Sequence, residues 1–364
     1  MKTRVQQILL AVSMLFAYTT IAQNIITVDN NPGSTTTHQT LLAAVNAAVD
    51  GDIIYLQPSE TSYGSATNIT KSLTIVGRSH SEPNKVSKIG SITVRASNVT
   101  LKGLDMAIFR IEGTTQITEN VNIFECQINA AIIGEDGMSD AKNIVVQGSI
   151  LGRTVIGVNT ENVLIANNII ARVGTMLDVA QAGTTIVTNN VFRGQTNSPD
   201  TSSIINNDAV PLVLSNNMFY IGSANANQVF EFDTGDFILN NNLSYKIGST
   251  IQFNAINGGS ITQNNTLANT NPLFTSIVSS TVASFGGGST YNPSARLADD
   301  FTLQASSPAL TGGVNGSQIG VYGNNFLYKQ LGQPRGIPTL DVISNDVTVQ
   351  QNGNLNITIN AKAN

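Results

Sequence analysis

The sequence predicts an all-β fold built as a solenoid, in which short strands wind into coils that stack along one axis. The main observation is a nine-residue motif that returns every 19 to 27 residues. A second is the alternation of apolar and polar residues within the motif, which is typical of strands with one buried face. Repeats of this length bury their apolar side chains only by stacking on their neighbours. Copies of the motif begin at Asn98, Asn120, Asn143, Asn162, Thr184, Pro211, Asp236 and Gly259.

The seventh residue of the motif is small and polar in most copies, so we expect the chain to turn there. Asn tolerates the left-handed backbone angles that such turns need. A turn at the same place in every coil would stack these side chains inside the solenoid as a hydrogen-bonded ladder. The predicted ladder comprises Cys126, Ser149, Asn168, Asn190, Asn217, Asn242 and Asn265. At this position Cys126, the only cysteine, is expected to be a small buried residue and not a reactive thiol.

A coil of this length has room for about three short strands. The motif supplies two of them, and a third fits upstream in the stretches 109–112, 154–158, 175–179, 229–233 and 250–254. Three strands per coil with a polar ladder at one turn resemble the right-handed parallel β-helix of pectate-lyase-like proteins. Residues 40–57, TLLAAVNAAVDGDIIYLQ, resemble the helix, turn and first strand that open many secreted β-helices. Four segments resemble, in the same order, the C-terminal sequence segments of bacterial β-helix proteins: NPLF (271–274), DDFTL (299–303), SSPAL (306–310) and IGVYG (319–323).

The resemblance implies a right-handed parallel β-helix of about ten coils. The β-helix domain would cover residues 23–325, with a capping α-helix over about 38–49 and an irregular excursion at 275–298. Residues 326–364 contain two short alternating stretches. They are expected to form a small strand-bearing cap on the last coil or a separate surface-docking segment, and the sequence leaves both open.

Residues 1–22 combine Lys2 and Arg4 with an apolar run, which is the pattern of a secretory signal peptide. This apolar run is too short to span a bilayer comfortably, and no apolar run in the mature chain is longer. We therefore expect a protein that is secreted or held at the outer cell surface, with the periplasm as an alternative, and that is a monomer. A net charge of −5 with only 11% charged residues argues against a nucleic-acid partner.

The sequence predicts neither a metal site nor a cofactor. Only two histidines, His38 and His80, accompany the single cysteine, so the ligands of a zinc site are missing. Residues 98–364 contain no histidine, which argues against a Ser-His-Asp triad in the coils. Calcium would be needed only if the protein were a polysaccharide lyase, whose acidic ligands lie on neighbouring coils beside a Lys or Arg base.

The acidic residues that fit a catalytic role best recur on the third strand of successive coils. They are Asp178, Asp208, Glu231 and Asp233, and Asn206 and Asn254 accompany them. Their offsets from the following motif are similar, so they are expected to share one face. The alternative, which we favour, is a solvated strand face with occasional acids.

Basic and aromatic residues recur just after the motif, and together they form a candidate ligand-binding ridge. Its members are Arg153, Arg172, Arg193, Tyr220 and Lys246, with Tyr245 beside the last. Arg binds carboxylates and sulfates in a fork, and Tyr stacks against sugar rings. Long side chains that only cover coil edges would give the same pattern.

These patterns favour an exported, non-catalytic β-helix protein that is associated with the cell surface or with a polysaccharide. An acidic polysaccharide or a cell-surface component is the expected partner. The first alternative is a polysaccharide lyase or glycoside hydrolase that acts on an acidic glycan. The second is an adhesive or structural surface subunit. The fold does not choose among these because it hosts many functions.

Overall fold

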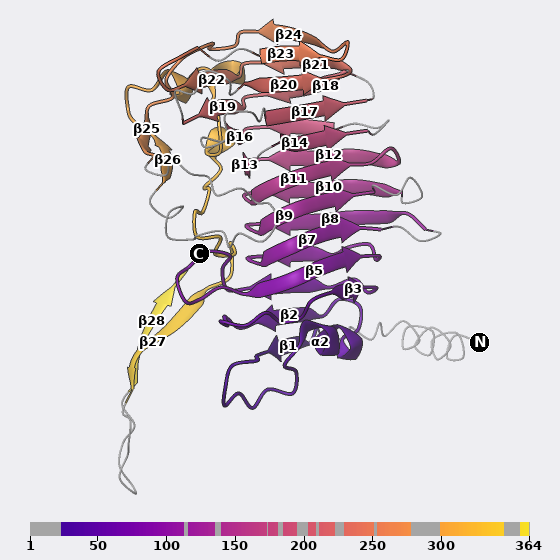
Figure 1. The fold of residues 1–364 in the computed structure, drawn as a ribbon. Coiled ribbons are helices and arrows are strands. Elements are labelled where there is room, and N and C mark those ends of the chain that lie inside the picture. Colours follow the sequence, from indigo (N-terminus) through magenta and orange to yellow (C-terminus); the bar gives the residue numbers. More distant parts are fainter. Residues whose placement is uncertain are drawn as a thin grey trace, which may run out of the picture.

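The computed structural model describes residues 23–112, 116–134, 140–172, 174–180, 185–194, 203–208, 211–222, 229–250, 253–277, 299–345 and 357–363. Its body is a right-handed parallel β-helix, as Figure 1 shows. The predicted signal peptide at residues 1–22 and most of the excursion at 275–298 lie outside the described residues. Among the described residues, no helix has the length and apolar character needed to cross a membrane.

One long parallel sheet forms the first wall of the β-helix. Its eleven strands come from successive coils and pair in chain order. They are β1 (Ile25–Val28), β2 (Ile53–Leu56), β4 (Thr74–Gly77), β6 (Thr100–Lys102), β8 (Thr118–Phe124), β10 (Ala141–Gln147), β12 (Thr160–Ala166), β15 (Thr185–Thr188), β18 (Leu212–Ser215), β21 (Asp236–Asn240) and β24 (Ser260–Asn264).

A second parallel sheet faces the first across the apolar core. Its main run is β3 (Thr67–Ile69), β5 (Lys88–Val94), β7 (Asp105–Ile111), β9 (Gln127–Ile133), β11 (Ile150–Ile156), β14 (Gly174–Val179), β17 (Ser203–Asn207), β20 (Phe230–Asp233) and β23 (Phe253–Ile256). A branch continues from the first part of β11 through β13 (Ile169–Ala171), β16 (Val191–Gly194), β19 (Met218–Ile221) and β22 (Leu243–Lys246).

The number of strands per coil changes at β11. Its residues Ile150 and Leu151 pair with β13, whereas Thr154–Ile156 pair with β14. In the coils before β11, the second sheet has one continuous strand where the later coils have two. The three strands predicted for each coil are therefore found only in the coils after β11. The upper coils fill their interior with phenylalanine, and the rings of Phe192 and Phe219 stack with centroids 5.0 Å apart.

The β-helix completes about eight turns, slightly fewer than the ten coils predicted. At the start, β1 is followed by the helix α2 (Leu41–Ala47) instead of a strand of the second sheet. Leu41, Ala44 and Val45 of this helix are buried against the core, so α2 covers the first end of the stack. It is shorter than the predicted helix because the Thr40 hydroxyl caps it, accepting from Ala43 N at 3.2 Å, and Ala48 is already extended.

The buried asparagine ladder is confirmed from Asn168 to Asn242. The backbone N–H groups of Asn168, Asn190 and Asn217 each donate to Oδ1 of the next asparagine, at 2.9, 2.9 and 2.8 Å. Their side-chain amides donate to the same oxygens at 3.1, 3.0 and 3.2 Å. All four asparagines are fully buried. The ladder thus satisfies polar groups that no water reaches.

The prediction that Asn265 belongs to this ladder is wrong by one residue. Asp236 pairs with Ser260, so the last motif begins at Ser260 and not at Gly259. Thr266 consequently takes the ladder position, while Asn265 is exposed with a left-handed backbone. The last coil thus has one residue more before its motif than the alignment assumed. This residue lies in the turn before β24, where Gly258 has a positive φ of 85°.

The left-handed residue of each turn is the sixth of the motif, not the seventh as expected. A left-handed residue reverses the alternation, so the sixth side chain points out and the seventh points in. The residues at this sixth position are Gly103, Glu125, Gly148, Asn167, Asn189, Asn216 and Asn241, with φ between 49° and 68°. A further exposed ladder follows the first position, where Nδ2 of Asn120, Asn143 and Asn162 donates to Oδ1 of the preceding asparagine at 3.1, 3.3 and 3.1 Å.

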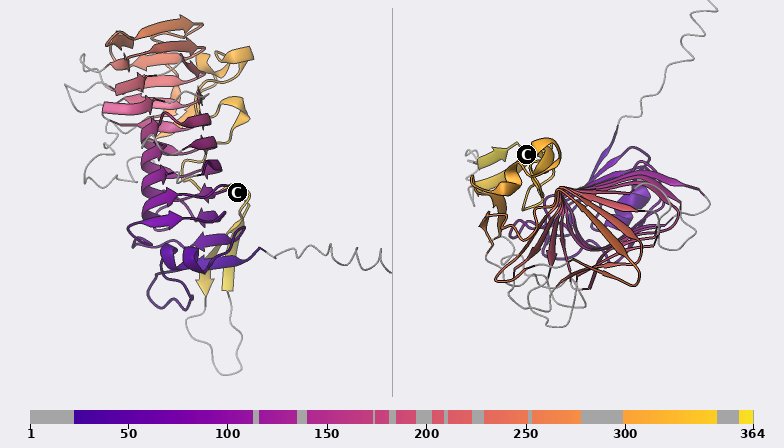
Figure 2. Two further views of the ribbon diagram at one scale, coloured as in Figure 1. Left: turned by 90° about the vertical axis from the view of Figure 1, so that its right-hand side faces the viewer. Right: turned by 90° about the horizontal axis from the view of Figure 1, so that it is seen from above.

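After the last coil, the chain folds back along the outside of the stack (Figures 1 and 2). The strands β25 (Phe274–Ser276) and β26 (Asp300–Leu303) pair antiparallel beside the upper coils. The short 3₁₀ turns η1 (Pro308–Leu310), η2 (Val314–Gly316) and η3 (Gly323–Asn325) follow. We call residues 312–335 the strap. Of the four segments that resemble the C-terminal segments of β-helix proteins, only IGVYG (319–323) lies in the strap, and the other three precede it.

Outward-pointing asparagines at the sixth position bind the strap. Each bonds to its backbone: Asn241 Nδ2 to Gly312 O at 3.3 Å, Asn216 Oδ1 to Val314 N at 2.9 Å, Asn189 Nδ2 to Gln318 O at 3.2 Å and Asn167 Nδ2 to Val321 O at 3.1 Å. The approach is close, since a Cβ added at Gly323 would lie 1.8 Å from Asn189 Nδ2. The strap thus runs antiparallel to the order of the coils.

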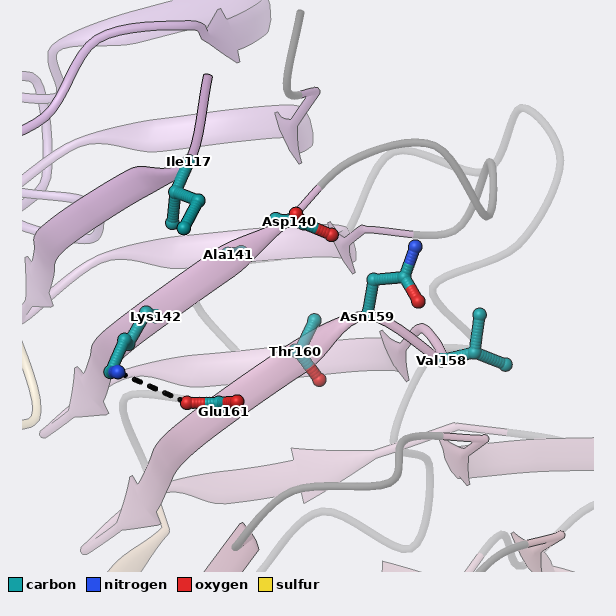
Figure 3. A pocket seen from close by; sticks show the side chains of 8 residues that line it. All are labelled: Ile117, Asp140, Ala141, Lys142, Val158, Asn159, Thr160 and Glu161. Atoms are coloured by element: carbon teal, nitrogen blue, oxygen red, sulfur yellow. Dashed lines mark ion pairs between the residues drawn. The ribbon is translucent and has the colours of Figure 1, made fainter. Parts of the chain in front are cut away.

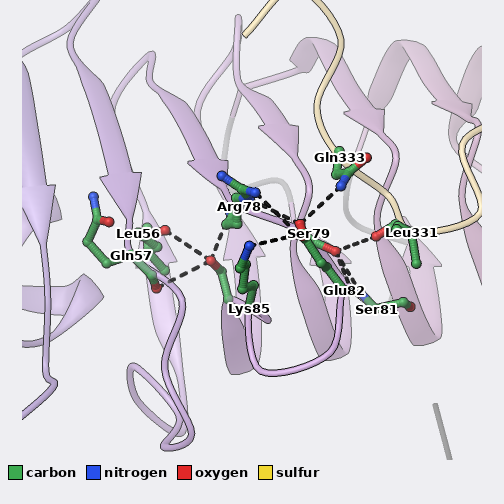
Figure 4. Close-up of polar contacts among 10 residues, drawn as sticks. Leu56, Gln57, Arg78, Ser79, Ser81, Glu82, Lys85, Leu331 and Gln333 are labelled. Carbon is green, nitrogen blue, oxygen red and sulfur yellow. Dashed lines mark hydrogen bonds and ion pairs between the residues drawn. The ribbon is translucent and has the colours of Figure 1, made fainter. Parts of the chain in front are cut away.

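The lower end of the strap reaches the loop that follows β4 (Figure 4). Leu331 O accepts from the Ser79 hydroxyl and from Ser81 N, the latter at 3.2 Å. Gln333 Nε2 donates to Glu82 at 3.0 Å. The hairpin of β27 (Thr339–Asn345) and β28 (Ile357–Lys362) follows and lies beside the first coils. Of the two alternatives for the tail, a cap on the last coil is therefore wrong.

The first prediction concerns the buried ladder. Asn217→Leu removes the acceptor of two N–H groups of Asn190, and we expect a loss of about 1–3 kcal/mol in the free energy of unfolding. Asn264→Leu is the matched control, because Asn264 is exposed and should cost less than about 0.5 kcal/mol. Urea unfolding of both variants measures the difference, and equal losses would contradict a special role for the ladder.

The second prediction concerns Cys126, which is buried and whose backbone N–H donates to Ser149 Oγ at 3.1 Å. Burial raises the pKa of its thiol to about 12. Because the thiolate is the reactive species, the native protein should react with a thiol reagent only slowly even in mildly alkaline buffer. The urea-unfolded chain should react fast. Equal labelling rates for the two states would show that Cys126 is accessible.

Candidate functional site

Polar side chains from four successive strands share one outward face of the second sheet. Phe230 and Phe232 point into the core, so Glu231 and Asp233 point out. The register places Asp178, Asn206 and Asp233 in one column. Glu231 and Asn254 are paired in the column beside it. We call these residues the amide–carboxylate face: Asp178, Asn206, Glu231, Asp233 and Asn254.

Three carboxylates of this region already have partners. Asp178 accepts from Arg153 Nη2 at 3.0 Å, and Asp233 accepts from Asn257 Nδ2 at 2.6 Å. Asp208 is exposed at the end of β17 and accepts from Thr234 Oγ1 at 2.7 Å. By contrast, Asn206 Oδ1 is buried and has no hydrogen-bond partner in the described structure. A buried acceptor without a donor is costly, and in this conformation neither solvent nor a surface ligand reaches it.

The acidic candidates do not gather into a metal site. Within the described ranges, no three His, Cys, Asp or Glu side chains lie close enough to hold a metal ion. Asp178 and Asp233 share a column, but Asn206 lies between them. Two strand spacings, about 10 Å, therefore separate the two carboxylates. The arrangement provides hydrogen-bond acceptors along a face and not a convergent set of ligands.

The predicted basic and aromatic ridge does not exist as one exposed surface. Arg193 is only 3% exposed, Tyr220 5% and Lys246 2%. Arg193 forms an ion pair with Asp299, which is also buried. The rings of Tyr220 and Phe274 meet edge to face with centroids 5.4 Å apart. The returning segment, from β25 to the strap, covers Arg193 and Tyr220, whereas Lys246 pairs with the inward-pointing Ile221 and is buried on the core side.

A second apolar core lies under this segment, outside the coils. It contains outward-pointing residues of the branch of the second sheet, which pack against Phe274, Phe301, Ile319, Val321 and Tyr328. A signal for it was present in the sequence. The eighth residue of the motif, which points outward, is apolar in five successive copies: Ile150, Ile169, Val191, Met218 and Leu243. Strands that are apolar at both alternating positions are buried on both faces.

Arg153 and Arg172 are the members of the predicted ridge that stay partly exposed. Burial lowers the pKa of Arg172, and the neighbouring charge of Arg153 lowers it further. Arg153 in turn is paired with Asp178 at 3.0 Å. The two arginines therefore lie at the lower edge of the amide–carboxylate face, and its nearest carboxylate already balances one of them.

A shallow pocket of about 340 Å³ opens at the turn edge of β10 and β12 (Figure 3). Two of its lining residues, Lys142 and Glu161, form an exposed ion pair at 3.1 Å. Ile117 and Val158 line its rim and are well exposed. Exposed pairs of this kind contribute little to stability. Among its described lining residues, no buried acid or base is present that could carry chemistry.

Comparisons with protein-family models and with curated proteins find no match for this chain.

The third prediction contrasts the two arginine ion pairs. Arg193→Met leaves Asp299 buried without this counter-ion and should cost about 3–5 kcal/mol in the free energy of unfolding. Arg153→Met removes a partly exposed pair and should cost about 0–1 kcal/mol. Thermal and urea unfolding measure both. If Arg193→Met were as mild as Arg153→Met, the segment that covers Arg193 would not be firmly attached to the stack.

Proposed function

We propose that the protein is an exported, non-catalytic β-helix protein that binds a polysaccharide along its amide–carboxylate face. One observation carries this proposal: amide and carboxylate side chains from four successive strands share that face. Strands repeat at about 4.8 Å, which is close to the length of one sugar unit. A polysaccharide that lies along the axis would therefore meet a polar side chain at each unit, in one of two neighbouring columns. Export rests on the pattern of residues 1–22.

The chemistry of the face favours a neutral, hydroxyl-rich polymer. Carboxylate oxygens accept hydrogen bonds from sugar hydroxyls, and amides both donate and accept. Glu231 and Asp233 give the face a negative charge, and Asp178 neutralises Arg153. A polyanion would be repelled here. The acidic polysaccharide expected from the sequence needs the complete ridge, and three of its five members are buried.

A specific observation favours a second candidate, a polysaccharide lyase. Arg172 has a lowered pKa, which is the direction that a general base requires. It lies beside Arg153, and the carboxylate of a uronate would have to compete with Asp178 for that guanidinium. In that case Arg172 would take the proton next to the carboxylate. An adhesive subunit that assembles end to end is disfavoured because α2 covers the first end of the stack.

The fourth prediction tests polysaccharide binding by electrophoresis in native gels that each contain one neutral or acidic polysaccharide. Asn206→Ala with Glu231→Ala should weaken binding to a neutral polymer about tenfold or more, because hydrogen bonds to a charged group contribute about 1.5–3 kcal/mol. Lys142→Ala with Glu161→Ala is the control, since these residues lie on the first sheet at the pocket of Figure 3. Unchanged retention of the Asn206/Glu231 variant would refute this face as the site.

The same protein separates the two candidates. Incubation with uronate polymers should yield no unsaturated product if the protein only binds. Product that forms with the parent and disappears with Arg172→Ala would instead establish the lyase. Because these assays use different polymers and different variants, the failure of one proposal does not decide the other.

A further inference from the structure

Lys329, in the strap, carries an ammonium group that is buried and has no hydrogen-bond acceptor in the described structure. An ammonium has three donors and is strongly hydrated, so its burial without acceptors is unfavourable. A pocket of about 260 Å³ lies directly against this residue. The end of β28 closes the other side of it. The pocket is lined by Lys329, Gln330, Leu331, Gln333, Lys362 and Ala363.

Positive charge is concentrated at this pocket although the whole chain carries a net charge of −5. Burial lowers the pKa of Lys329, Glu125 opposes this shift, and the charges of Arg335 and Lys362 lower the pKa further. Lys102 is a further cation near Glu125. Three cations, Arg335, Lys102 and Lys329, therefore act on one buried carboxylate, and Lys362 lies near Lys329.

The nearby carboxylates are already engaged by other residues. Arg335 Nε lies 2.8 Å from Glu125 Oε1, although the two are not aligned as a hydrogen bond. Glu82 is paired with Arg78 at 3.1 Å and with Lys85 at 3.2 Å (Figure 4). Neither carboxylate supplies an acceptor to the Lys329 ammonium. Within the described residues, the Lys329 ammonium therefore has charge compensation from Glu125 but no hydrogen-bond acceptor.

We infer that this pocket binds a small oxyanion, a carboxylate or a phosphate, between the strap and β28. Lys329 and Lys362 supply the charge from opposite sides of the pocket. Gln333 uses one amide N–H within the protein, to Glu82, and has a second N–H to offer. Charge-assisted hydrogen bonds to an oxyanion are strong. Since Lys362 belongs to β28, a bound oxyanion would also hold the hairpin against the strap.

This site is independent of the amide–carboxylate face. That face uses the upper part of the second sheet, whereas the pocket lies where the strap reaches the first coils. A polymer that binds the face need not fill the pocket. The two proposals can therefore be tested with different ligands and different variants.

The fifth prediction is tested by calorimetric titration of the full chain with inorganic phosphate and, separately, with acetate, at constant ionic strength set with chloride. At least one of the two should bind, and Lys329→Met should weaken that binding about tenfold or more. Lys142→Met is the matched control, because it removes an exposed lysine that does not line the pocket, and it should bind as the parent does. Which anion binds identifies the chemistry of the ligand.

Thermal unfolding in anion-free buffer provides the second measurement. If Lys329 serves a ligand, Lys329→Met should unfold at the same temperature as the parent or higher, because a buried charge without an acceptor has been removed. Added ligand should stabilise the parent and not the variant. The inference fails if neither anion binds or if Lys329→Met binds as well as the parent. It also fails if the variant is destabilised with its affinity unchanged, since Lys329 would then be structural.

Discussion

The structure depends on one backbone constraint, the left-handed residue at the sixth position of the repeated motif. It turns the chain so that the sixth side chain points out and the seventh points in. Inside, Asn190 and its equivalents form a buried ladder whose bonds hold successive coils in register. Outside, Asn189 and its equivalents bind the backbone of the strap. A single turn conformation, repeated in coil after coil, therefore organises both the interior and one exterior surface.

The returning segment then decides which surfaces remain available. It covers the branch of the second sheet, where Arg193 and Tyr220 become part of a second buried region. It leaves open the face that carries Asn206 and Glu231. It also brings Lys329 next to the end of β28. This contact lies beside the first coils, whereas the returning segment starts at the last coil. The candidate binding surfaces are thus defined as much by this segment as by the coils.

The sequence predicted the ladder well where the motif was regular and failed where it was not. Asn168 to Asn242 lie where they were expected, because each pairs with its neighbour at a constant offset in the motif. Asn265 was misplaced because one extra residue precedes β24, and Thr266 lies at the ladder position. The amide–carboxylate face was likewise predicted from similar offsets. That Asn206 Oδ1 has no hydrogen-bond donor was not predicted, because this depends on which donors lie nearby in space.

By itself, the sequence determined the solenoid, its buried ladder and the shared face of Asp178 and Asp233. These features involve coils that are adjacent in the chain, so their contacts recur with the period of the motif and can be read from it. Only the tertiary structure decided the pairing of buried Arg193 with Asp299, 106 residues away, and the contact of Ser79 with Leu331, 252 residues away. Those contacts occur once and follow no period. Their partners are selected by the path of the strap through space, which no local pattern of residues encodes.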